Sequence, residues 1–282
     1  MKTIGIAGAG TMGSGIAQTA AMARFSVILT DTNPAALKGA MAKITGELDR
    51  LVEREVITER DAAATLRRIQ PARTLRELAD ADLVIEAAVE DLAVKRTIIR
   101  TLDPIVSPHA VLASNTSSLS IGAIAAAVRN PETVVGMHFF NPAPVMKLVE
   151  IIRGPQTSDE AVKAVLEAAA AMGKTAVLCR DTPGFIVNRI ARPFYGEALR
   201  LLGEGAGSVE AIDRIMKLEG GFRMGPFELM DLIGIDVNYA VTLSVYEQFF
   251  HEPRFRPHPL QRRMVEAGTL GRKTGRGFYQ YS

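Results

Sequence analysis

The sequence predicts an α/β protein, in which a doubly wound sheet with an inserted helical hairpin is followed by a smaller all-α domain. Three observations carry this prediction. Short apolar runs alternate with helical patterns through residue 181, strand patterns stop after that point, and a glycine-rich turn joins the first strand to the first helix. Runs that are apolar throughout are typical of parallel strands buried on both faces.

Six strands are expected in the first domain, which we assign to residues 1–181. They are predicted at residues 3–7, 27–29, 83–87, 111–113, 134–137 and, after a proline-containing turn, 147–152. Their carboxyl ends should form the ligand-binding edge of the sheet. The segment at about 34–69 is too long for an ordinary crossover and holds two amphipathic patterns divided near residues 56–58, which predicts a helical hairpin.

The second domain, residues 182–282, shows only helical patterns and is expected to be all-α. Pro183 suits the first turn of a helix that Thr182 would cap. Helical patterns continue to about residue 268, with breaks at Gly205, Gly220, Gly221, Gly234 and Pro253.

Composition excludes several classes of protein. With 48% hydrophobic and 23% charged residues the chain is globular rather than disordered or collagen-like, and a net charge of +2 gives no field for nucleic acid. The longest uncharged stretch, between Asp103 and Arg129, is interrupted by prolines and polar residues, so no membrane span is expected. A single cysteine, Cys179, cannot form an intrachain disulfide or a thiolate metal site, which favours a reducing compartment, the cytoplasm, and no metal.

The glycine turn has the spacing of a Rossmann-type dinucleotide site. The first strand leads directly into Gly8, Ala9, Gly10, Thr11, Met12 and Gly13. In this motif the glycines allow a tight turn, the approach of a pyrophosphate and close packing of helix on strand. Asp31, at the end of the second strand, suits the adenosine ribose hydroxyls and would repel a 2′-phosphate, which predicts NAD rather than NADP. The alternative is a plain glycine turn with Asp31 capping the next helix.

A hydride-transfer enzyme also needs a group that takes the proton of the substrate hydroxyl, and histidine is the usual choice. Of four histidines only His138 ends an expected central strand. Glu150 lies twelve residues later in an apolar run, where its carboxylate needs a partner. Were the two segments neighbours, Glu150 would orient the imidazole of His138 and stabilise its protonated form. A purely structural pair explains the spacing equally well.

Two further polar positions suit the same site. The run Asn115 to Ser118 follows the fourth strand, where the nicotinamide should lie, and Ser117 could bond the substrate oxygen. These residues could equally cap a helix beginning near Leu119. Asn188 lies in an apolar helix expected at 184–202, and its amide needs partners either in the site or on the backbone.

Several long strings, in order along almost the whole chain, resemble those of the L-3-hydroxyacyl-CoA dehydrogenases. Besides the glycine turn they are residues 114–119 (Ser-Asn-Thr-Ser-Ser-Leu), 136–142 (Gly-Met-His-Phe-Phe-Asn-Pro), 146–150 (Met-Lys-Leu-Val-Glu), 182–189 (Thr-Pro-Gly-Phe-Ile-Val-Asn-Arg), 224–229 (Met-Gly-Pro-Phe-Glu-Leu) and the closing 270–279.

The resemblance implies NAD-dependent interconversion of (S)-3-hydroxyacyl-CoA and 3-oxoacyl-CoA. His138 would be the base, Glu150 its orienting partner, and Ser117 and Asn188 would bond the substrate. In the family, the positions of three further residues contact the cofactor, here Glu90, Lys95 and Asn115. Lys95 could alternatively be a surface charge.

The resemblance also implies a CoA site on the helical hairpin, where Arg50 and Arg54 match basic positions of the family, although a solvated charged face is an equal alternative. It implies a homodimer formed through the second domain, around residues 227–245. Chain length and the closing segment are most similar to the bacterial 3-hydroxybutyryl-CoA dehydrogenases of fatty-acid and butanoate metabolism. Residues 224–235 also resemble 3-hydroxyadipyl-CoA dehydrogenases of phenylacetate breakdown, an alternative substrate. A catalytically silent NAD-binding protein is the alternative from another class.

Overall fold

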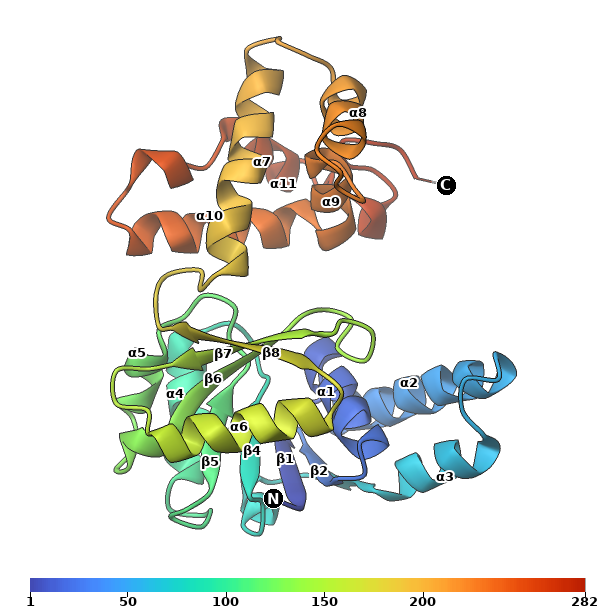
Figure 1. Ribbon diagram of the computed structural model, residues 1–282, viewed down its shortest axis with the longest axis vertical. Helices are drawn as coiled ribbons and strands as arrows, with labels where there is room; N and C mark the ends of the chain where they lie inside the picture. The colour runs from blue at the N-terminus through green and yellow to red at the C-terminus, as the bar shows by residue number, and fades with distance from the viewer. Residues whose placement is uncertain (282) are drawn as a thin grey trace. The chain divides into compact units, whose positions relative to one another are not determined.

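A computed structural model of the chain describes residues 1–281, which form two compact units. Unit 1 is Met1–Thr182, and unit 2 begins at Pro183. Unit 1 is a sheet of eight strands with helices on its faces, and unit 2 consists of helices, as Figure 1 shows. The predicted fold class, a doubly wound sheet followed by an all-α domain, is confirmed.

The sheet of unit 1 has the strand order β3-β2-β1-β4-β5-β6-β7-β8. All neighbouring strands are parallel except β6 and β7, which are antiparallel. The strands are β1 (Thr3–Ala7), β2 (Ser26–Thr30), β3 (Ile69–Ala72), β4 (Leu83–Glu86), β5 (Val111–Ser114), β6 (Val134–Phe139), β7 (Leu148–Arg153) and β8 (Thr175–Arg180).

All six predicted strands are present, and the two that were missed, β3 and β8, lie at the two edges of the sheet. β3 has Gln70 and Pro71 in place of a continuous apolar run, whereas residues 176–179 of β8 are such a run and were not predicted as a strand. β3 contains Pro71, which an edge position tolerates because one side of the strand donates no ladder bond. β8 exposes Val177 and Leu178.

The helices of unit 1 cover the sheet, and the core between them consists of fully buried aliphatic side chains such as Ile4, Ile6 and Leu83. The helices are α1 (Thr11–Met22), α2 (Pro34–Glu53), α3 (Glu59–Arg67), α4 (Leu92–Leu102), α5 (Ile121–Ala125) and α6 (Asp159–Ala171), with the short 3-10 turns η1 (Leu75–Leu78) and η2 (Pro131–Thr133). The expected helix near Leu119 in fact begins at Ile121, because Ser120 supplies its cap.

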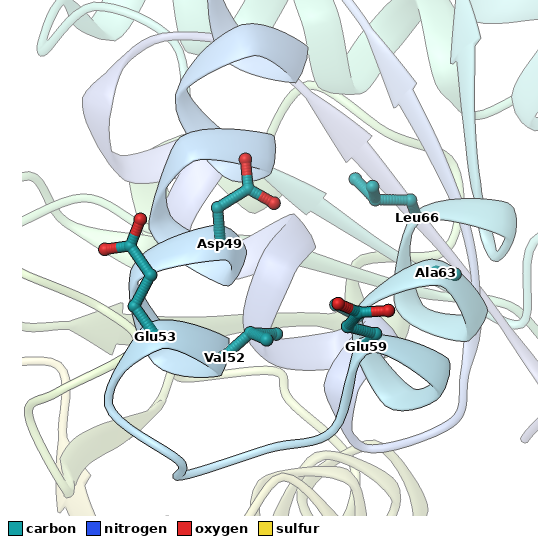
Figure 2. Close-up of a pocket in the computed structure, with 7 residues that line it drawn as sticks. Asp49, Val52, Glu53, Glu59, Ala63 and Leu66 are labelled. Carbon is teal, nitrogen blue, oxygen red and sulfur yellow. The ribbon is translucent and has the colours of Figure 1, made fainter.

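The predicted helical hairpin is formed by α2 and α3, which extend away from the sheet (Figure 1). Asn33 caps α2, and a capping box of Thr58 and Asp61 begins α3, so the polar residues between the two apolar patterns set the turn. Between the two helices lies a cavity of about 370 Å³. Figure 2 shows its lining, with Asp49, Val52 and Glu53 from α2 and Glu59, Ala63 and Leu66 from α3.

Unit 2 packs its helices around Tyr195, Leu199, Phe227, Met230 and Ile235. The helices are α7 (Val187–Gly203), α8 (Val209–Leu218), α9 (Pro226–Ile233), α10 (Ile235–Gln248) and α11 (Pro259–Glu266), with the 3-10 turns η3 (Pro253–Phe255) and η4 (Arg272–Thr274). The breaks between them fall where the glycines and Pro253 predicted them.

One predicted helix start in unit 2 is wrong. Thr182 does not cap a helix, since α7 begins at Val187 and residues 183–186 form a turn. Gly184 and Phe185 have φ of 74° and 50°, which is left-handed backbone that a right-handed helix excludes.

Two buried carboxylates fasten the closing segment of unit 2. Asp231 in α9 accepts hydrogen bonds from the backbone N–H groups of Phe278 and Tyr279 and from the hydroxyl of Tyr281. Asp213 in α8 accepts one from the hydroxyl of Tyr279. The tyrosine-rich end of the chain is therefore part of the unit 2 fold.

Among residues 1–281 no single helix is long and apolar enough to cross a membrane. Helices α9 and α10 are long and apolar enough only when they are taken together, and they are bent by 101° at their junction.

Candidate active site

The glycine turn lies at the carboxyl end of β1 and opens α1, whose N-cap is Gly10. A side chain at Gly8, where φ is 114°, would lie 2.7 Å from the Ala87 carbonyl oxygen, and one at Gly13 would lie 1.8 Å from that of Gly8. Nothing lies within 4 Å of the corresponding position at Gly10. Gly8 and Gly13 therefore allow close packing. Gly10 leaves open space beside the helix N-terminus, which fits a pyrophosphate. Thr11 and Met12 form the first turn of α1 behind it.

Asp31 follows β2, and its carboxylate is held toward the glycine turn. One oxygen accepts the N–H of Ala9 at 2.8 Å, and the other accepts that of Asn33 at 2.8 Å. The alternative that Asp31 caps the next helix is wrong, because Asn33 caps α2. An acidic group in this place, followed by the neutral Thr32 and Asn33, suits ribose hydroxyls and disfavours a 2′-phosphate.

His138 and Glu150 form a buried pair across the antiparallel strands β6 and β7. The strand register places the two residues opposite each other, and the His138 Nδ1 lies 2.8 Å from Glu150 Oε2. Both side chains are nearly inaccessible to solvent. A carboxylate at Nδ1 favours the tautomer that carries its proton there, so Nε2 is left with the lone pair. Such an imidazole can accept a proton at Nε2 while the carboxylate stabilises the resulting charge.

The segment between β5 and α5 is tied to β6 and to the loop that follows β4. Asn115 Oδ1 accepts the N–H of Phe139, at the end of β6, at 2.9 Å. The hydroxyl of Ser117 donates to Glu90 Oε1 at 3.0 Å, and its backbone N–H donates to the same oxygen at 2.8 Å. Thr116, rather than Asn115 or Ser117, receives the N–H of Leu119. Asn115 and Ser117 thus lie at the carboxyl ends of central strands, as predicted.

Lys95 is buried in this region and forms an ion pair. Its side chain, in the first turn of α4, is 1% exposed, so the alternative that it is a surface charge is wrong. Its ammonium donates to both carboxylate oxygens of Glu86, at 2.9 and 3.0 Å, and lies 3.4 Å from Glu90 Oε2. Glu86 was not singled out from the sequence. The signal was present, since Glu86 lies within an apolar run as Glu150 does.

Asn188 belongs to unit 2 and is the second residue of α7. Its carbonyl accepts a hydrogen bond from Nε of Arg192, one turn later, at 3.1 Å. The expected helix at 184–202 is therefore shifted to begin three residues later, which places Asn188 at the helix start instead of inside it.

Arg50 lies in the last turn of α2, and Arg54 directly follows that helix; both side chains are exposed. Neither lines the cavity between α2 and α3, whose acidic residues, Asp49, Glu53 and Glu59, would repel a phosphate. The cavity in Figure 2 is therefore no candidate for the CoA nucleotide, and any such contact by the two arginines is on the outside of the hairpin.

The remaining histidines and the cysteine do not compete with His138. His109 and His251 are exposed, and His258 caps α11 through its ring nitrogen. Burial, with the charges of Glu150 and Asp181, raises the pKa of the Cys179 thiol to about 12, far from a reactive thiolate. Among residues 1–281 no group of three or more His, Cys, Asp or Glu side chains is arranged to hold a metal ion.

Two family descriptions together match nearly the entire chain. Residues 3–182 match "3-hydroxyacyl-CoA dehydrogenase, NAD binding domain", and residues 184–281 match "3-hydroxyacyl-CoA dehydrogenase, C-terminal domain".

Individual relatives agree with this match. The chain is 47% identical to the 3-hydroxyadipyl-CoA dehydrogenase of Escherichia coli over 281 residues, which is 100% of this chain but 59% of that protein. It is 47% identical to the probable 3-hydroxybutyryl-CoA dehydrogenase of Bacillus subtilis, covering 100% of this chain and 98% of that one. A crystal structure of (S)-3-hydroxybutyryl-CoA dehydrogenase PaaH1 from Ralstonia eutropha superposes with a TM-score of 0.96 at 46% identity, covering 100% and 99% of the two chains.

Proposed function

The chain belongs to the 3-hydroxyacyl-CoA dehydrogenase family, and we propose that it interconverts (S)-3-hydroxybutyryl-CoA and acetoacetyl-CoA with NAD. It is an oxidoreductase, and its first unit is an NAD-binding domain. The observation that carries the proposal is the buried His138–Glu150 pair at the carboxyl end of β6, beside the segment that holds Ser117.

In the proposed mechanism His138 Nε2 removes the proton of the 3-hydroxyl group, and Glu150 stabilises the imidazolium at Nδ1. Bound NAD supplies the acceptor for the hydride that leaves C3 of the substrate. Ser117 and Asn188 bond the substrate oxygen and keep it oriented toward His138. In the reverse direction His138 returns the proton to the forming alkoxide.

The proposed cofactor contacts follow the strand ends of unit 1. The turn from Gly8 to Gly13 with Thr11 and Met12 receives the pyrophosphate, and Asp31 receives the adenosine ribose. Glu90, Lys95 and Asn115 hold the nicotinamide half. For Lys95 this role is indirect, since its buried ammonium is bonded to Glu86 and lies beside Glu90.

The decisive assay follows NADH consumption with acetoacetyl-CoA. Replacing His138 with alanine should lower kcat by about 10²- to 10⁴-fold and leave the affinity for NAD nearly unchanged. His109→Ala, which removes an exposed histidine, is the matched control and should retain full activity. An active His138→Ala variant would place the base elsewhere, and a wild-type chain inactive on every 3-oxoacyl-CoA would favour the silent NAD-binding protein.

The substrate alternative is 3-hydroxyadipyl-CoA, because the Escherichia coli relative carries that name. A comparison of kcat/KM for acetoacetyl-CoA, longer 3-oxoacyl-CoAs and 3-oxoadipyl-CoA separates the two. A higher value for 3-oxoadipyl-CoA would replace the proposed substrate while leaving the reaction unchanged.

Arg50 and Arg54 are proposed to contact the CoA nucleotide from the exposed side of the hairpin. Replacing both with alanine should raise KM for acetoacetyl-CoA and leave kcat unchanged, because the nucleotide lies far from the reacting carbon. Arg100→Ala, on the exposed face of α4, is the control. An unchanged KM would mean that the arginines only face solvent.

We also propose that the chain acts in the cytoplasm as a homodimer joined through unit 2. Unit 2 exposes several large apolar side chains on its helices, among them Leu218, Leu232 and Val237. Large apolar side chains exposed in one patch mark an interaction surface. Light scattering should report a dimer, and the double variant Leu232→Glu with Val237→Glu should be a monomer; a dimeric variant would place the interface elsewhere.

A further inference from the structure

Glu86 ends β4 with a carboxylate that is completely inaccessible to solvent. It accepts the N–H of Ala88 at 2.7 Å and the hydroxyl of Ser114 at 2.6 Å, besides two bonds from the ammonium of Lys95. The Glu86–Lys95 ion pair is thus complete within the protein. Its net charge is zero, so a second ionised acid beside the pair leaves the whole group with one net negative charge.

Glu90 is that second acid, and it faces outward. Its Oε2 lies 3.4 Å from the Lys95 ammonium, and its Oε1 accepts four hydrogen bonds from Thr116, Ser117 and Ser118. Its side chain is 38% exposed, whereas those of Glu86 and Lys95 are buried. Two carboxylates share one ammonium, so the cluster carries one net negative charge on its accessible side.

The Glu90 carboxylate is also held in its charged form. Burial by itself would raise the pKa of this carboxyl, but the Lys95 ammonium and the hydrogen bonds from Thr116 and Ser117 outweigh burial and leave the pKa lowered. The four donors come from the segment that follows β5. They hold the carboxylate in one position and also stabilise its charged form.

The cluster lies where the nicotinamide half of the cofactor belongs. In the sheet β4 and β5 follow β1, away from β2 and Asp31 (Figure 1). A dinucleotide that places its adenosine at Asp31 and its pyrophosphate at the β1 turn extends across the carboxyl ends of β4 and β5. The nicotinamide ring is a cation in NAD⁺ and neutral in NADH, so a fixed negative charge there distinguishes the two forms.

We propose that the Glu86–Lys95–Glu90 cluster biases the enzyme toward the oxidised cofactor, by holding a net negative charge at Glu90 beside the nicotinamide. Glu90 supplies the charge, whereas Glu86 is a positioning residue that keeps the Lys95 ammonium from neutralising Glu90 fully. Because only a difference in affinity between two ligands can discriminate them, the quantity that reports this role is the ratio of the dissociation constants of NADH and NAD⁺.

The test measures both dissociation constants by calorimetry, using the full chain without acyl-CoA. Glu90→Gln keeps the size and one acceptor oxygen but removes the charge. It should weaken binding of NAD⁺ about tenfold more than binding of NADH, the size expected for one charge at short range in a partly solvated site. Glu86→Gln, which frees Lys95 to neutralise Glu90, should shift the ratio in the same direction.

Thr116→Val is the matched control, because it removes one hydrogen bond to Glu90 and keeps the charge. The ratio of its dissociation constants for NADH and NAD⁺ should stay within about twofold of the wild-type ratio, even where both affinities fall. The lost hydrogen bond affects binding of both forms alike. Parallel losses for the two cofactors in Glu90→Gln would overturn the proposal.

A measurement on the wild-type chain covers the case in which Glu90→Gln fails to fold. Salt screens the charge of a partly exposed group, so rising ionic strength should weaken the binding of NAD⁺ more than the binding of NADH. An unchanged ratio would also overturn the proposal. Neither experiment depends on the acyl-CoA, so a wrong substrate assignment would leave both outcomes interpretable.

Discussion

Each unit of the chain buries one long cation, and the two are compensated in different ways. Lys95 in unit 1 is 1% exposed and bonded to the two oxygens of Glu86. Arg192 in unit 2 is 4% exposed, yet no carboxylate within residues 1–281 forms an ion pair with it. Its guanidinium donates instead to the carbonyls of Asn188 and Asn238 and to the hydroxyl of Thr242.

The consequence appears in the ionisation of Arg192. Burial lowers its pKa to about 10, although the nearby Tyr195 opposes this. The guanidinium stays charged at neutral pH, held by dipoles and by the face of the Tyr195 ring, 5.0 Å away. Lys95 is thus paired with a carboxylate that depends on it, whereas Arg192 is bonded to neutral groups, so removal of Lys95 should destabilise the fold more.

The largest effect is expected for Lys95→Met. The variant leaves Glu86 fully buried without its counter-charge, and the free energy of unfolding should fall by about 3–5 kcal/mol. Urea unfolding followed by circular dichroism measures it. Lys163→Met, which breaks an exposed pair with Glu167, should change stability by no more than about 0.5 kcal/mol. A loss as small as this in Lys95→Met would mean that Glu86 does not need the ammonium.

A smaller net loss is expected when both partners are replaced. The double variant Glu86→Gln with Lys95→Met removes the stranded charge, so it should recover about half or more of the stability lost in Lys95→Met alone. The same urea titration decides. A double variant less stable than the single one would show that Glu86 is held chiefly by Ser114 and the backbone N–H of Ala88.

Arg192→Met should cost only about 1–2 kcal/mol, because it strands no charge. The Asn238 carbonyl keeps the hydroxyl of Thr242 as a donor. All five tyrosines lie in unit 2 and the chain has no tryptophan, so tyrosine fluorescence follows the unfolding of this unit. A loss equal to that of Lys95→Met would remove the distinction between the two cations.

The smallest expected effect is a change in folding stability at low pH. The folded pKa of Glu90 lies below its unfolded value, so the unfolded chain binds more protons between the two values, and stability from this group rises with pH there. Its contribution is complete above the unfolded pKa and is lost as the pH falls through the folded one. The stability difference between wild type and Glu90→Gln should therefore shrink on acidification below about pH 4.3. A difference that grew in acid would contradict the sign.

Much of the site could be predicted because it depends on local patterns. The glycine spacing, Asp31 after the second strand and the acid at Glu150 in an apolar run each carry a signal within a few residues. Edge strand β3 carried no such signal, because Gln70 and Pro71 interrupt its apolar residues, whereas β8 carried an apolar run at residues 176–179 that was not recognised as a strand. The true start of α7 was hidden as well, since the left-handed backbone at Phe185 is not a preference of phenylalanine.

The sequence by itself determined the order of elements, the family resemblance and the residue types that the reaction needs, because these follow from periodicity and from motifs along the chain. Only the tertiary structure decided how charges are shared. That His138 faces Glu150 depends on an antiparallel register, and that Lys95 is buried between Glu86 and Glu90 depends on where α4 packs at the end of β4. Electrostatic energies depend on distance and burial, and neither is written in the spacing of residues along a chain.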